Sequence, residues 1–296
     1  MNFISKIACI SVLSLTLSAG AVWASSVHII VNNLNIPSDD VYQSHGTTMV
    51  PLNAVQSLPE VSITWNNTTK TVIIDRSGKK TILKVGQKNI TIGSKKITLP
   101  VAPTLRNGRV MVPLRFIADS SGAYVSWNQK SQTAYVAKAS NEIKKKYTSD
   151  KLNVSRGAVI KLPKISNLKE FTPKGYENLD TDYYFPEGKS DSFFIQEMDV
   201  ISFYKASNDH VELIWTARFD STKKESNGCL SFLPYKLLEQ DGLRPTIQNR
   251  VAHFNFMSAI GEISYSLIDN NGKEITQGQK LVDPTNFFID IPGEQK

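Results

Sequence analysis

Residues 108–114 read GRVMVPL, and residues 46–52 read GTTMVPL. Glycine, methionine, valine, proline and leucine recur in the same order at an offset of 62 residues (108 − 46 = 62). The offset continues beyond this stretch, because Trp65-Asn66 and Trp127-Asn128 are related in the same way. A match held this long without a gap indicates two copies of one supersecondary unit rather than a short motif.

Each unit combines an extended segment, a short helix and a hairpin. Pro51 and Pro113 fit the first turn of a helix, where the missing N–H costs no hydrogen bond. In the second unit Gly122 ends the helix, as a glycine after the last turn commonly does. Alternating residues then predict hairpins over 61–65 with 70–75 and over 124–127 with 132–137, and three short strands lie between the units at 79–85, 89–92 and 95–99.

Apolar residues at helical and strand spacing assign one side of each unit to the core. In the second hairpin the alternation places Val125 and Trp127 inward and Tyr124 and Ser126 outward, so we expect the repeat tryptophans in the core. The predicted structural core of the repeat comprises Val50, Pro51, Leu52, Trp65, Val112, Pro113, Leu114, Ile117, Gly122, Val125 and Trp127.

The second unit resembles the copper amine oxidase N-terminal-like domain, a small stalk domain common in exported proteins of Gram-positive bacteria. The resemblance rests on residues 108–118 together with Gly122, Val125, Trp127 and Asn128. It implies an α+β fold of antiparallel sheet packed on short helices. It implies no copper chemistry, because in the amine oxidases this domain is remote from the metal and their catalytic part has no counterpart here.

The resemblance sets the expected domain organisation. A stalk-like domain covers residues 27–138, a charged linker or short surface helix covers 139–150, and residues 151–296 form a second domain. Short strands separated by turn signals predict that the second domain is mainly-β and sandwich-like. The predicted fold class is α+β: a two-repeat antiparallel sheet with short helices, followed by that domain.

Three local predictions concern the second domain. Residues 151–192 have little periodicity and predict irregular structure with one or two strands. Residues 233–240 predict one short helix, stopped at Gly242. Residues 287–291 predict the strand that closes the chain.

Residues 1–24 predict a cleavable secretory signal peptide. Lys6 precedes an apolar run over 7–17, and small residues lead to Ala24 at the cleavage position. An uncleaved anchor is the alternative, but no later stretch is apolar enough to span a bilayer, so no transmembrane segment is expected after signal removal. We expect a secreted, extracellular or wall-associated protein, in which Cys229 has no intramolecular disulfide partner.

Chemistry-bearing motifs are scarce. The four histidines form no metal-type pair, and no nucleophile elbow or phosphate loop is present, so we expect no catalytic residue, cofactor or metal. Asp180 with Asp182, and Glu197 with Asp199, could each present paired acids. Aromatics at 183–185 and 193–194 could form a sugar-stacking platform, but filling a β core is the commoner role.

These features favour a non-catalytic exported protein that attaches to the cell wall or cell surface. The formal net charge of +7 is explained by solubility alone or by an anionic partner. Taken with the resemblance, it gives an anionic wall polymer or an envelope protein as the expected partner, with Lys144–Lys146 as an attachment point. We expect no nucleic-acid binding, because no recognition motif is present. The alternative is a secreted hydrolase of wall glycan or peptide with acids in 176–220; a secreted inhibitor or accessory subunit is a third. Nothing in the sequence determines the oligomeric state.

Overall fold

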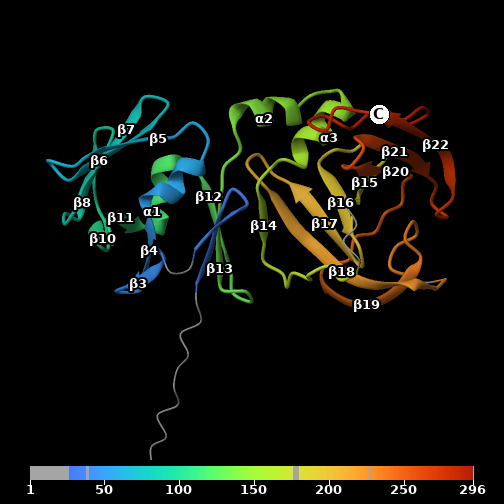
Figure 1. Cartoon of the computed structure of the whole chain (residues 1–296), viewed down its shortest axis with the longest axis horizontal. Coiled ribbons are helices and arrows are strands. Elements are labelled where there is room, and N and C mark those ends of the chain that lie inside the picture. The colour runs from blue at the N-terminus through green and yellow to red at the C-terminus, as the bar shows by residue number, and fades with distance from the viewer. Residues whose placement is uncertain (1–26, 38–39, 176–179, 227, 296) are drawn as a thin grey trace, which may run out of the picture.

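The computed structural model describes residues 27–37, 40–175, 180–226 and 228–295, which form two lobes side by side (Figure 1). The predicted signal peptide lies outside these residues. The described chain is rich in strands, with three α-helices and several sheets, so the coarse expectation of a mainly-β chain with short helices is confirmed. Within the described ranges, no helix has the length and apolar character needed to cross a membrane.

The N-terminal lobe contains three small sheets around one core. The interface sheet has the order β12 (Tyr124–Asn128), β13 (Thr133–Ala137), β1 (His28–Val31), β2 (Leu34–Ile36). The central sheet has the order β10 (Thr104–Arg106), β11 (Arg109–Pro113), β4 (Thr47–Pro51), β3 (Tyr42–Ser44). The outer sheet has the order β5 (Ser62–Asn66), β6 (Thr71–Arg76), β7 (Lys79–Lys84), β8 (Asn89–Ile92), β9 (Lys95–Thr98). A 3₁₀ helix η2 (Leu52–Ser57) and helix α1 (Leu114–Ser121) complete the lobe.

The elements of the two sequence units recur at the same offset of 62. Strands β3, β4, β5 and β6 and helix η2 begin 62 residues before β10, β11, β12, β13 and α1. Positive φ angles recur as well: Gly46 and Gly108 have φ 72° and 75°, and Glu60 has φ 58° where Gly122 has 68°. Strands β4 and β11 pair antiparallel with Val50 opposite its own counterpart, Val112. The units therefore face each other across a local pseudo-two-fold axis in the central sheet.

The core of this lobe contains part of the predicted set. Val50, Leu52, Val112, Leu114 and Ile117 are buried in one cluster. The two prolines are buried as well, but they end strands β4 and β11 and precede the helices instead of forming their first turns. Gly122 is the left-handed residue that ends α1.

The prediction that Trp65, Val125 and Trp127 are core residues is wrong. Their exposed fractions are 36%, 38% and 42%. They point to the predicted face, since Trp127 stands opposite Ala134, which is buried. However, β5 and β12 are edge strands, so no further strand covers their side chains.

The C-terminal lobe is one nine-stranded sheet, so the predicted sandwich is wrong. This large sheet has the order β14 (Lys164–Ser166), β18 (Val211–Lys224), β17 (Val200–Ala206), β16 (Ser192–Glu197), β15 (Asp180–Pro186), β20 (Val251–Met257), β21 (Glu262–Ile268), β22 (Glu274–Leu281), and β19 (Tyr235–Gly242) also pairs with β18. The helix predicted over 233–240 is therefore wrong: these residues extend because they pair with the long strand β18.

Both faces of the large sheet are buried at its central strands, whereas the edge strands β19 and β22 are largely exposed. Phe193 and Phe194 are adjacent, fully buried, and belong to separate hydrophobic clusters on opposite faces. Residues 229–233 cover one face. The other is covered by α3 (Leu152–Val159), which the sequence did not predict, and by residues 287–291, which form no strand. Short strands separated by turn signals fit a single sheet covered by a helix and loops as well as they fit two packed sheets, so this pattern could not distinguish the two architectures.

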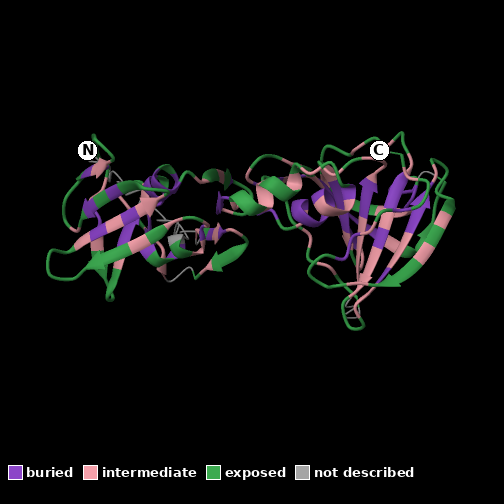
Figure 2. Ribbon diagram, turned by 90° about the horizontal axis from the view of Figure 1, so that it is seen from above, coloured by how far each residue is buried: buried purple, intermediate pink, exposed green. Residues whose placement is uncertain are grey.

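The charged segment 139–150 is the short helix considered as the alternative to a linker. Helix α2 (Asn141–Tyr147) is capped at its N-terminus by Ser140, whose Oγ accepts a hydrogen bond from the N–H of Ile143 at 3.2 Å. Ala139 is buried in the core under the large sheet, and Ile143 and Tyr147 pack against it. One side of the segment therefore packs on the C-terminal lobe, while the rest of α2 is exposed, in agreement with its pink and green colours in Figure 2.

The lobes pack across the outer face of the interface sheet. Tyr135, Ala137 and Ile165 form a small buried cluster there. The Asn128 side chain donates to the carbonyl of Leu168 at 3.0 Å, and Tyr124 stacks on His210 with ring centroids 4.3 Å apart. The interface sheet thus has the N-terminal core on one face and the second lobe on the other.

Candidate functional site

The outer sheet carries a concentration of positive charge. Residues 62–98 contain eight lysines and arginines and one acid, Asp75, which gives a net charge of +7. Lys80, Lys84 and Lys96 are exposed. The strand register puts them on one face of the sheet, opposite Asp75, Thr71 and Thr91. Ile82 lies on the same face and is 43% exposed. We call this solvent face of β5–β9 the lysine face.

The lysine face contains one acid, Asp75 opposite Lys80, but its lysines form no ion pair with a described carboxylate. No lysine or arginine of residues 62–98 forms an ion pair with a described carboxylate, since the ion pairs involve other cations. The Asp75 carboxylate instead accepts the N–H of Gly78 at 2.8 Å, within its own turn. The positive potential of this face is therefore available to an external anion.

Lys144–Lys146, the predicted attachment point, is a poorer candidate. Lys144 lies 2.5 Å from Asp209, and Lys146 lies 2.7 Å from Glu142 on the same helix. Two of the three charges are thus neutralised within the protein. The sequence could not show this pairing for Lys144, because Asp209 is 65 residues away along the chain and reaches it only through the fold.

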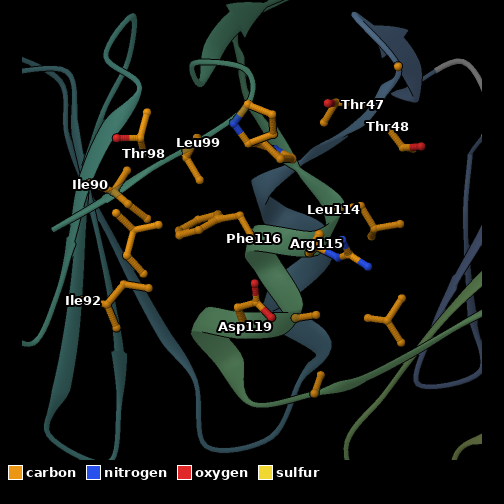
Figure 3. A pocket seen from close by; sticks show the side chains of 17 residues that line it. Thr47, Thr48, Ile90, Ile92, Thr98, Leu99, Leu114, Arg115, Phe116 and Asp119 are labelled. Atoms are coloured by element: carbon orange, nitrogen blue, oxygen red, sulfur yellow. The ribbon is translucent and has the colours of Figure 1, made fainter. Parts of the chain in front are cut away.

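A groove opens on the opposite side of the outer sheet, between strands β8 and β9 and helix α1 (Figure 3). It has a volume of about 570 Å³. Phe116 points from α1 toward Ile90 and Ile92. Arg115 and Asp119 are its charged lining residues, and their counterparts in the first unit are Asn53 and Ser57, so the charges belong to the second unit alone. The lining is mostly apolar and contains no paired acids or histidine.

The four acids of the hydrolase alternative do not converge. The Asp182 carboxylate accepts hydrogen bonds from His253 and from Asn255, at 2.8 and 2.9 Å. Asp199 instead pairs with Arg218 on the neighbouring strand. Neither these two nor Asp180 and Glu197 line the five main cavities of the described chain. Without a shared pocket they cannot act as a general acid and base on one substrate.

One polar cluster was not foreseen from the sequence. Ser266 lies 3.3 Å from His253 Nδ1, and the other ring nitrogen of His253 contacts Asp182. The three residues come from three adjacent strands that are far apart in the sequence, so no local motif predicts the cluster. Ser266 is only 3% exposed, and a buried hydroxyl cannot reach a substrate carbonyl. The cluster satisfies buried polar groups within the sheet.

The remaining candidates are structural. Tyr184, Phe185, Phe193 and Phe194 are buried and form no exposed sugar-stacking platform. Cys229 is also buried, and burial raises the pKa of its thiol to about 11, which disfavours the reactive thiolate. Over the described ranges, no group of three or more histidine, cysteine and acidic side chains could hold a metal ion.

Comparison with known proteins identifies one part of the chain. Residues 30–136 match the family model for the copper amine oxidase N-terminal domain, and a second match covers residues 108–169. The second match starts at Gly108, where the second sequence unit begins. No curated protein matches the chain. The rest of the chain has no family match, so similarity to the copper amine oxidase N-terminal domain, a family of non-catalytic stalk-like domains, is shown for residues 30–169 alone.

Proposed function

We propose that this is an exported, non-catalytic binding protein whose N-terminal lobe attaches to an anionic polymer of the cell wall. The observation that carries the proposal is the lysine face, where Lys80, Lys84 and Lys96 lie together and form no ion pair with a described carboxylate. A flat, cationic strand surface can contact several charges of one extended polymer at once. Binding of this kind releases counter-ions and depends strongly on salt.

The distribution of charge between the lobes supports the same assignment. Residues 27–138 contain 13 basic and five acidic residues, a net charge of +8. Residues 139–296 contain 20 basic and 22 acidic residues, a net charge of −2. Attraction to a polyanion therefore acts on the N-terminal lobe and leaves the C-terminal lobe directed toward another ligand.

The test is sedimentation of the mature chain, residues 25–296, with isolated cell walls. The variant Lys80→Gln/Lys84→Gln/Lys96→Gln should bind walls about tenfold more weakly, because three unpaired charges are removed at exposed positions. The control Lys144→Gln/Lys146→Gln/Lys223→Gln removes the same charge from lysines that are already paired with acids, and it should bind like the parent protein.

Two results would contradict the proposal. Equal weakening by both triple variants would show that net charge alone matters and the lysine face does not. Undiminished binding to walls from which the anionic polymers have been extracted would show that the ligand is a neutral glycan or a wall protein.

A further inference from the structure

A cleft lies between the two lobes, on the outer face of the interface sheet. Two cavities, of about 270 and 430 Å³, share the lining residues Ile30, Tyr135 and Glu170 and are therefore neighbours. The smaller cavity is formed by strands β1 and β13 of the N-terminal lobe and by β14, β17 and β18 of the C-terminal lobe. Both lobes are needed to build it, and domain interfaces are frequent positions for small-molecule sites.

The smaller cavity contains one cation and one carboxylate. Lys164 is half-buried, its ammonium lies 5.5 Å from the centre of the Tyr204 ring, and it forms no ion pair with a described carboxylate. Glu170 is exposed and accepts a hydrogen bond from the Tyr135 hydroxyl at 2.8 Å. Burial lowers the pKa of Lys164, and the charges of Glu197 and Glu170 oppose that effect only in part.

Apart from Asn33 and Ser166, the remaining walls are aromatic and aliphatic. Tyr135 and Tyr204 contribute rings, and Ile30 and Leu213 contribute aliphatic side chains. Burial raises the pKa of Tyr135 and Tyr204 more than any other cause. Both side chains therefore remain neutral hydroxyl donors at neutral pH. The cavity thus offers a positive group, a negative group and an apolar surface within a volume suited to a ligand of amino-acid size.

We infer that this cleft binds a small zwitterion, an α-amino acid with an apolar side chain. Its carboxylate would pair with the Lys164 ammonium, its ammonium would pair with Glu170, and its side chain would pack between Tyr204 and Leu213. No described carboxylate forms an ion pair with the Lys164 ammonium, so the ligand carboxylate can pair with it without displacing an ion pair of the described chain. The site is independent of the lysine face, which lies on a different sheet.

The test uses the mature chain and L-leucine as the probe, with binding measured by calorimetry. L-leucine should bind, and leucinamide and N-acetyl-leucine, which each lack one of the two charges, should bind at least about tenfold more weakly. Lys164→Met and Glu170→Gln should each weaken L-leucine binding by a similar factor. The controls Lys189→Met and Glu225→Gln change exposed residues outside the cleft and should leave binding unchanged.

Failure of L-leucine to bind the parent protein would overturn the inference, and so would equal binding of the three probes. If Lys164→Met unfolds the protein, as circular dichroism would show, the two analogues and Glu170→Gln still decide the matter. Loss of wall binding in the lysine-face variant with normal L-leucine binding would separate this site from the proposed wall attachment.

Discussion

His210 is the side chain through which we expect pH to act on the contact between the lobes. It is 7% exposed, stacks on Tyr124 of β12, and its Nδ1 has no hydrogen-bond partner among the described residues. Burial lowers the pKa of His210, and the charges of Glu212 and Asp209 oppose this effect only in part. The folded protein therefore resists protonation of this ring more than the unfolded chain does.

The expected consequence is a loss of stability on acidification. As the pH falls through the ordinary histidine pKa of about 6.5, the unfolded chain binds a proton that the folded protein does not, so the free energy of unfolding decreases. Urea denaturation of the parent protein and of His210→Gln between about pH 7.5 and pH 5 should show a smaller decrease for the variant. Identical pH dependence in the two proteins would rule out His210 as the cause.

At the scale of elements, the C-terminal segment covers one face of the large sheet without forming a helix or a strand. Residues 287–291 form no strand, yet Phe288 is 2% exposed and packs edge-on against Phe254, with ring centroids 4.9 Å apart. Glu294 holds the end of the segment in place by pairing with the buried guanidinium of Arg156 on α3. The segment thus closes one face of the large sheet as a strand or helix would.

Phe288→Ala should therefore lower the free energy of unfolding by about 3–5 kcal/mol, because it removes a buried aromatic ring and leaves a cavity. Leu281→Ala is the matched control on the neighbouring edge strand, where the side chain is 70% exposed, and it should change stability little. Chemical denaturation monitored by tryptophan fluorescence compares the two. A small effect of Phe288→Ala would show that the segment is only loosely attached.

At the scale of the molecule, the uneven charge of the lobes makes a prediction about ionic strength. The positive lobe should lose affinity for walls steeply as salt increases, because each lysine that contacts the polymer releases counter-ions. For the variant Lys80→Gln/Lys84→Gln/Lys96→Gln, the slope of log affinity against log salt should be smaller by roughly 2. A salt titration of the sedimentation assay measures the slope, and an unchanged slope would mean that these lysines do not contact the polymer.

Much of the N-terminal lobe could be predicted from the sequence alone. The offset of 62 between GTTMVPL and GRVMVPL reappears in the start of every paired element and in the positions of positive φ. Local chemistry is sufficient here, because turn glycines and alternating apolar residues act over a few positions. The same rules predicted the hairpin strands β5, β6, β12 and β13 to within one residue at each end.

Only the tertiary structure decided which residues are covered and which charges are paired. Trp65 and Trp127 have the pattern of core residues, but the position of their strands at sheet edges leaves them exposed. Lys144 and Lys80 look alike in sequence, yet the fold brings Asp209 to the first, whereas no described acid forms an ion pair with the second. Burial and pairing depend on contacts between residues far apart along the chain, and no local pattern contains that information.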